Sequence, residues 1–199
     1  MAITRFAFLR SLKGFALWVS GIKGSLWFVA IGGFRVGIVK DPKALVGAVS
    51  GAAAPHPAQI VDAERVAGRE HLFMAAVNAA KSAETGMAVS KSVSVEALLY
   101  ASAQDQITKA IRMLGVSSKS KTIALVVFAH GREEAESAYR DAAKHLGDED
   151  DGVLEIDKTK VASLKETYGV GDEELEVVGG PEALGRLIVE RGALLSLRR

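Results

Sequence analysis

The stretch KTIALVVFAH, residues 121–130, is the clearest β-strand in the sequence and decides the class of fold. Its apolar side chains are continuous and largely β-branched, whereas a strand with one face in water alternates apolar and polar side chains. A continuous run is typical of a central strand that is covered on both faces. We therefore expect this strand to lie in the middle of a sheet flanked by helices.

Strands and helices alternate on either side of this strand. Residues 25–39, SLWFVAIGGFRVGIV, predict one strand with a bulge or two strands in a hairpin, because glycines interrupt β-branched and aromatic residues. The Asp41–Pro42 pair predicts a helix start that ends before Pro55, since it supplies an N-cap and a proline at the first helical position. The remaining predictions are short strands over 58–63 and 152–157, an acidic loop over 147–152, and helices over 67–86, 132–146, 159–169 and 180–199. This order indicates an α/β (α+β) fold, with a small mixed sheet flanked by helices in a single domain over residues 25–199.

The composition is that of an ordinary globular domain with an uneven charge. The chain has 199 residues, a net charge of +1 and no cysteine, so disulfides, thiol nucleophiles and thiolate metal sites are excluded. The absence of cysteine fits a reducing cytoplasm, where we expect the protein to be located. Residues 1–43 carry a net charge of +6 and residues 131–180 a net charge of −9. A basic region of this kind suits contact with phosphates or an acidic partner, although charge runs are often only solvated surface.

Residues 1–24 are interpreted as a basic N-terminal extension. Their apolar run FALWV is interrupted by Ser20, Gly21 and Lys23, so it is too short to span a membrane. The segment also lacks a good signal-peptide cleavage site. We favour a soluble appendage, and the alternative is a membrane-peripheral adaptor that uses residues 1–24.

The most patterned stretch is EALLYASAQDQITKAIRMLG, residues 96–115, which predicts two short helices meeting at an angle. Ser102 and Asp105 have the spacing of a capping box for the second helix, which Gly115 ends. An apolar stripe is predicted to face the core, and the opposite face is polar. The stripe comprises Ile107, Ala110, Ile111 and Leu114, and the polar face comprises Asp105, Thr108, Lys109 and Arg112.

Glu96, near the start of the first of these helices, has two interpretations. It either binds a neighbouring backbone donor or the positive end of the helix dipole, or it is an exposed acid on a helix surface.

No sequence motif indicates a catalytic, metal or cofactor site. The four histidines lack metal-ligand spacing, and the glycines fit neither a phosphate-binding loop nor a nucleophile elbow. We therefore predict no catalytic residue, no metal and no cofactor. The alternative is a small-molecule enzyme with His130 as a general base at the sheet edge, for which a nearby acid such as Glu96 would be needed.

At residues 96–115 the sequence resembles a known family. The pattern E-x-L-L-Y-x-S-x-x-x-Q-I-x-x-A-I-x-x-x-G is similar to that of the small kinase-binding (TPRKB-like) subunit of the KEOPS tRNA-modification complex. A second block, QIVDAERVAGREHL at 59–72, resembles the family's segment entering its long helix. The resemblance covers roughly residues 25–199. The sequence departs from the family pattern at Ala103, where glycine is common in the family. Residues 1–24 have no counterpart in the family.

The resemblance implies a non-catalytic accessory subunit for N6-threonylcarbamoyladenosine modification of tRNA. Such a subunit binds the kinase-like ATPase subunit and, in archaeal relatives, the single-stranded 3′ CCA end of tRNA. From the cations and amides near the patterned stretch, we predict an RNA-binding set comprising Ser90, Lys91, Gln106, Lys109 and Arg112. For contact with the protein partner we predict His71, Phe73 and Met74, on the helix over 67–86.

Overall fold

The computed structural model describes residues 17–198 and confirms the α+β class. The sheet has the order β1-β2-β4-β3, with the short strand β5 paired to the other end of β2. Every pairing in the described part of the chain is antiparallel, so the sheet is antiparallel and not mixed. The strands are β1 (Trp18–Gly21), β2 (Phe28–Arg35), β3 (Ala58–Asp62), β4 (Thr122–Ala129) and β5 (Asp148–Glu149).

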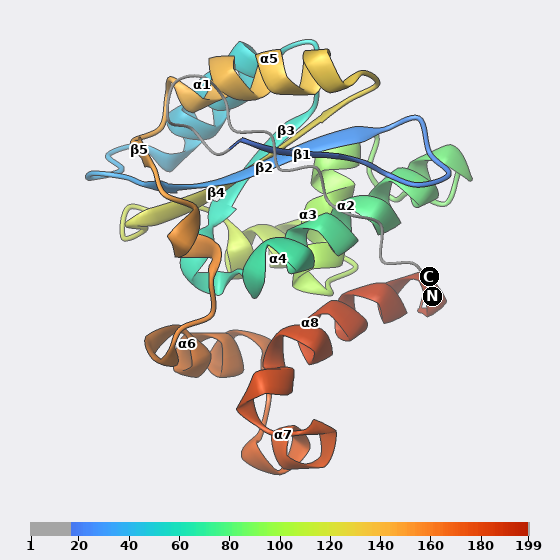
Figure 1. Ribbon diagram of the computed structural model, residues 1–199, viewed down its shortest axis with the longest axis vertical. Helices are drawn as coiled ribbons and strands as arrows, with labels where there is room; N and C mark the ends of the chain where they lie inside the picture. Colours follow the sequence, from blue (N-terminus) through green and yellow to red (C-terminus); the bar gives the residue numbers. More distant parts are fainter. Residues whose placement is uncertain (1–16, 199) are drawn as a thin grey trace.

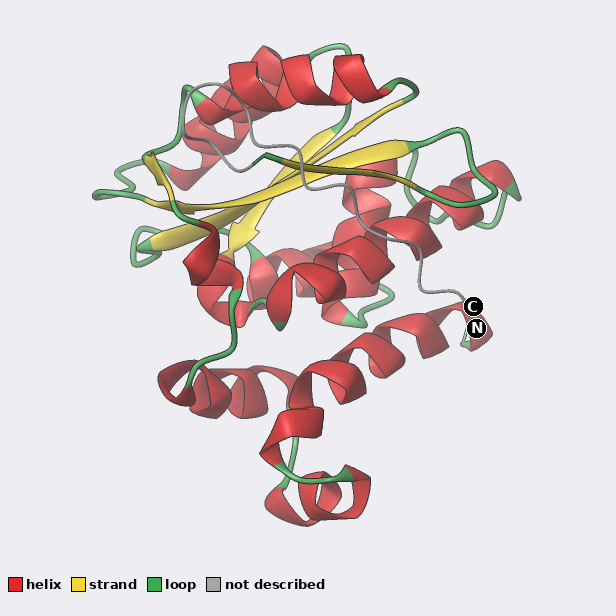
Figure 2. Cartoon of the chain, in the orientation of Figure 1, coloured by secondary structure: helices red, strands yellow, loops and turns green. Residues whose placement is uncertain are grey.

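Helices cover both faces of the sheet (Figure 1). On one face lie α1 (Pro42–Ala53) and α5 (Arg132–Ala143). On the other lie α2 (Gly68–Glu84), α3 (Val93–Ser102) and α4 (Ile107–Leu114). A further helical layer lies beyond them, formed by α6 (Lys158–Tyr168), α7 (Asp172–Val178) and α8 (Leu184–Ala193). Short 3-10 turns lie at Ala63–Arg65, Asp151–Leu154 and Pro181–Ala183, and a fourth, Leu194–Leu197, follows α8. Figure 2 shows helices, strands and loops in separate colours.

Strand β4 is the centre of the fold, as its sequence predicts. All eight of its residues are buried, and it pairs with β2 on one side and β3 on the other. Its alternate side chains enter two cores: Phe128 packs with the α2–α3 side, and Val127 packs with the α1–α5 side. The continuous apolar run therefore reflects burial on both faces.

The two glycines of β2 serve close packing, and β2 is one unbroken strand instead of a bulged strand or a hairpin. A Cβ atom on Gly32 would overlap the hydroxyl oxygen of Tyr139, and one on Gly33 would lie 2.7 Å from the backbone oxygen of Asp150. Tyr139 reaches past Gly32 to donate a hydrogen bond of 2.7 Å to Glu149. The missing side chains thus make room for α5 and for the turn that follows β5.

Several predicted boundaries agree with the structure. The Asp41 side chain accepts a hydrogen bond from the Ala44 amide at 2.9 Å, so the predicted N-cap of α1 is confirmed. The predicted strand over 58–63 and the helices over 67–86, 132–146 and 159–169 are also confirmed, as β3, α2, α5 and α6.

Other parts of the structure differ from what the sequence predicts. The predicted strand over 152–157 is wrong, because residues 151–154 form a 3-10 turn and the short strand β5 lies in the predicted acidic loop. Helix α7 was not predicted. Strand β1 lies within residues 1–24, which the sequence suggested to be an extension, yet it pairs with β2. The rest of that extension, residues 1–16, lies outside the described residues.

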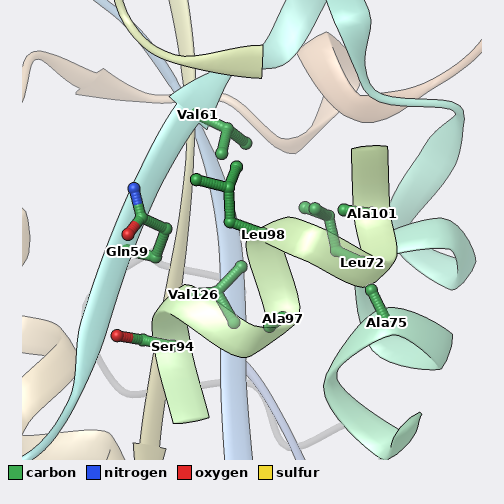
Figure 3. A pocket seen from close by; sticks show the side chains of 9 residues that line it. All are labelled: Gln59, Val61, Leu72, Ala75, Ser94, Ala97, Leu98, Ala101 and Val126. Carbon is green, nitrogen blue, oxygen red and sulfur yellow. The ribbon is translucent and has the colours of Figure 1, made fainter. Parts of the chain in front are cut away.

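The packing between the sheet and helices α2 and α3 is tight. The gap there has a volume of about 10 Å³, and Figure 3 shows that its lining includes Leu72, Leu98 and Val126. A space of this size holds at most a single water molecule, so it is a packing defect and not a ligand site.

Candidate functional site

The turn between α3 and α4 begins with a strained residue. Ala103 caps α3 in the left-handed region with φ of 51°, the conformation in which glycine is usual. Ser102 is the last residue of α3, and its hydroxyl donates to the carbonyls of Leu98 and Leu99. The predicted capping box of Ser102 and Asp105 is therefore wrong: α4 begins later, after Gln106, without a side-chain cap.

Helix α4 exposes more apolar surface than its sequence predicts. Ala110 and Leu114 are fully buried, but Ile107 is 38% exposed and Ile111 is 53% exposed. The apolar stripe thus lies only half in the core, since α4 sits at the edge of the helical layer. Periodicity identifies an apolar face but does not tell how deeply it is buried.

The polar face of α4 is open to solvent. Gln106, at the N-cap, and Lys109 and Arg112 are all exposed, and at 100° per residue they lie on the side of the helix opposite Ile107 and Ile111. Two cations and an amide therefore share one side of α4, and the partly exposed isoleucines lie on the other. We call Gln106, Lys109 and Arg112 the α4 face.

The C-terminal end of α4 is fixed by its neighbours. The Arg65 guanidinium donates to the carbonyl oxygens of Arg112 and Met113, which would otherwise lack partners in the helix. Gly115 follows where a Cβ atom would collide with the Ile111 carbonyl, and its amide donates to that carbonyl at 2.7 Å. Both contacts hold the α4 face in one position.

The structure does not bring the whole predicted RNA-binding set together. Ser90 and Lys91 precede α3, whereas Gln106, Lys109 and Arg112 follow it. The two groups thus follow from opposite ends of α3, a helix of ten residues about 15 Å long. Lys91 is exposed and Ser90 is half-buried. The α4 face is thus the compact part of the set.

Glu96 is a structural residue that fixes the loop before α3. It is fully buried, and its carboxylate accepts hydrogen bonds from the amides of Val89 at 3.1 Å and Ser90 at 2.9 Å. Of its two interpretations, the one in which it binds a neighbouring backbone donor is confirmed, and the exposed acid is wrong. These two hydrogen bonds offset the free energy that the side chain loses when burial removes it from water.

His71 lies in the core and joins three elements. It is 2% exposed; its Nδ1 accepts from the Ala67 amide at 3.2 Å and its Nε2 lies 2.8 Å from the Ala101 carbonyl. Burial lowers its pKa from 6.5 to about 4, so the ring is neutral at pH 7. The Tyr168 hydroxyl donates to the same Ala101 carbonyl, which ties α6 to this pair. A side chain this buried offers no surface to a partner, so the described fold does not support His71 as a contact residue.

Phe73 and Met74 remain candidates for partner contact. Both are half-buried on α2, and Phe73 packs edge-on against Trp18 with ring centroids 5.2 Å apart. Part of each side chain is therefore accessible.

His130 has neighbours unlike those of a catalytic base. It is exposed, stacks on Trp27 with ring centroids 4.0 Å apart, and its Nδ1 lies 3.4 Å from the carbonyl oxygen of Leu26. Glu96, the acid suggested as its partner, instead accepts hydrogen bonds from backbone amides of the loop before α3. Within residues 17–198 no group of three or more potential ligands could hold a metal ion, and no helix is long and apolar enough to cross a membrane.

Fold and site together define a class: a small α+β protein that presents an exposed amphipathic helix on a rigid scaffold. Comparison with known families then identifies the chain within that class. The model of the CGI-121 kinase binding protein family matches residues 38–196, so this chain belongs to that family. A relative is the regulatory protein Cgi121 of Methanocaldococcus jannaschii, which is 34% identical over 113 residues, or 56% of this chain and 70% of the relative.

Proposed function

We propose that this protein is a non-catalytic regulatory subunit of the KEOPS complex, which modifies tRNA with N6-threonylcarbamoyladenosine. Its partners in this proposal are the kinase-like ATPase subunit and the 3′ CCA end of tRNA, in the cytoplasm. Membership of a kinase-binding family and the similarity to a regulatory protein support the kinase partner and the regulatory role. The resemblance of residues 59–72 and 96–115 to the KEOPS subunit supports the rest.

The α4 face is the observation that carries the RNA part of the proposal. Lys109 and Arg112 are exposed and can contact phosphates, and the exposed amide of Gln106 can bond a base edge. The helix is held by Arg65, so binding requires little ordering of the protein.

For the kinase partner, Phe73 and Met74 on α2 are the proposed contacts. They suit this role because aromatic and methionine side chains are enriched in the cores of protein interfaces.

Charge reversal on α4 tests the RNA proposal. We expect Lys109→Glu with Arg112→Glu to weaken tRNA binding by roughly a hundredfold at low salt, because two phosphate contacts are replaced by repulsion. The measurement is filter binding or fluorescence anisotropy with intact tRNA and with tRNA that lacks the CCA end.

The matched control reverses two exposed lysines next to α1, Lys40→Glu with Lys43→Glu, which changes the net charge equally on the other side of the sheet. Equal affinities of the α4 variant and the control for intact tRNA, or the same wild-type affinity for truncated tRNA, would refute the proposal.

A further inference from the structure

A cavity of about 330 Å³ lies where the turn between α3 and α4 meets the C-terminal ends of α6 and α8. Figure 1 shows α6 and α8 beneath the α3–α4 pair. The volume is within the range of small-ligand sites, which starts near 300 Å³. None of the described residues that line it is acidic, and two are arginines, Arg191 and Arg198. The sign of the charge at the wall therefore favours an anion.

Arg191 is held in place by protein contacts to both terminal nitrogens of its guanidinium. It donates to the Tyr168 carbonyl and, through Nη2, to both carboxylate oxygens of Glu174 at 2.6 and 2.7 Å. A guanidinium has five N–H donors, so these three contacts leave two for a ligand. Glu174 offsets part of the charge but does not itself line the cavity.

Arg198 and Gln104 carry N–H donors that make no hydrogen bond, or only long ones, within the protein. The Arg198 side chain is exposed, and within residues 17–198 its guanidinium has no hydrogen bond or ion pair. The Gln104 amide nitrogen makes only long contacts, 3.4 Å to the Ser102 carbonyl and 3.8 Å to the Met113 sulfur. Both groups can turn toward a ligand at little cost in lost hydrogen bonds.

The cavity wall also contains the strained residue of the turn. Among residues 17–198, Ala103 is the only non-glycine residue with positive φ, and it lines this cavity. A left-handed residue is common where a helix ends, so the cavity lies at the point where the chain leaves α3.

We propose that this cavity binds the oxyanion of a small polar molecule, either a phosphate or a carboxylate. Arg191 supplies a prepositioned guanidinium, Arg198 closes on the anion from the solvent side, and the Gln104 amide donates a further hydrogen bond. Guanidinium groups bind both classes of oxyanion with paired hydrogen bonds. The inference concerns a site for small molecules and does not rest on the proposed contacts with tRNA or a kinase.

Isothermal titration calorimetry at constant ionic strength tests the site. The probes are inorganic phosphate, ribose 5-phosphate and citrate, with ribose as the neutral counterpart. We expect saturable binding of at least one anion, and a loss of roughly tenfold or more in affinity for Arg198→Glu and for Gln104→Glu. The matched control is Arg186→Glu, an exposed arginine of α8 that does not line the cavity and is expected to leave the affinity within twofold.

The probes separate the two sources of the oxyanion. Binding of the two phosphates without citrate identifies a phosphate site, and binding of citrate alone identifies a carboxylate site. The proposal is overturned if no anion binds saturably, if ribose binds as tightly as ribose 5-phosphate, or if Arg186→Glu weakens binding as much as Arg198→Glu.

Discussion

At the scale of single residues, we expect the left-handed conformation of Ala103 to lower the stability of the fold. Replacing Ala103 by glycine should raise the free energy of unfolding by about 0.5–1 kcal/mol, because glycine adopts positive φ without the clash of a Cβ atom. Urea unfolding measures the change. The control is Ala101→Gly inside α3, which should lower stability by about 1 kcal/mol; a loss of stability for Ala103→Gly would show that the strain is not in the backbone.

Gly32 allows a test of the packing across the sheet. Gly32→Ala should lower the free energy of unfolding by about 1–3 kcal/mol or more, since the new methyl group must displace the ring of Tyr139. In a double-mutant cycle, Tyr139→Phe should recover part of this loss, because it removes the hydroxyl that the methyl group meets first. Strictly additive effects of the two substitutions would contradict the contact.

His71 makes the stability of the protein depend on pH. Its pKa is about 4 in the folded state and about 6.5 when unfolded, so between these values only the unfolded state binds the proton. Stability is unaffected above pH 6.5 and falls as the pH drops through this window, by up to about 3 kcal/mol.

Chemical unfolding between pH 7 and pH 4 measures this dependence. His71→Gln should flatten this part of the profile, while the exposed His145→Gln should retain it. An unchanged slope for His71→Gln would mean that other groups are responsible.

At the scale of elements, buried side chains position the loops around the candidate site. Glu96 holds the loop before α3, and Arg65 holds the end of α4. Glu96→Gln keeps the shape but replaces one acceptor oxygen by a donor. We expect faster hydrogen exchange of the Val89 and Ser90 amides in this variant, measured by mass spectrometry or NMR, because they lose a charged acceptor.

The α4 amides serve as the internal control for that experiment, since α4 does not depend on Glu96. An equal acceleration in α4 would indicate global destabilisation and would contradict a local role for Glu96.

At the scale of the whole molecule, structural features that depend on local patterns of apolar and capping residues can be predicted from the sequence. Features that depend on contacts between residues far apart in the chain cannot. The continuous apolar run of β4 and the Asp41 cap of α1 are local patterns, and both were predicted. Gly32 and Gly33 suggested a bulge because their real partners, Tyr139 and the turn at Asp150, lie more than 100 residues away.

The same contrast between local patterns and distant contacts applies to the candidate site. The exposed cations of α4 could be predicted from its periodicity, but the exposure of Ile111 could not, since it depends on where α4 sits in the layer. His71 was singled out through the family resemblance, yet its burial follows from contacts with α3 and α6. Helix α7 escaped prediction because it is only seven residues long and buries only Leu175.

Co-purification tests the central claim, a regulatory subunit with separate kinase and RNA contacts, most directly. The tagged wild-type protein and the Lys109→Glu, Arg112→Glu variant are recovered from native extract, and bound proteins and RNA are identified by mass spectrometry and sequencing. We predict that the wild type brings down a kinase-like ATPase subunit together with tRNA, and that the variant retains the ATPase subunit but loses the tRNA. Recovery of neither partner with the wild type, or of equal tRNA with both proteins, would contradict the account.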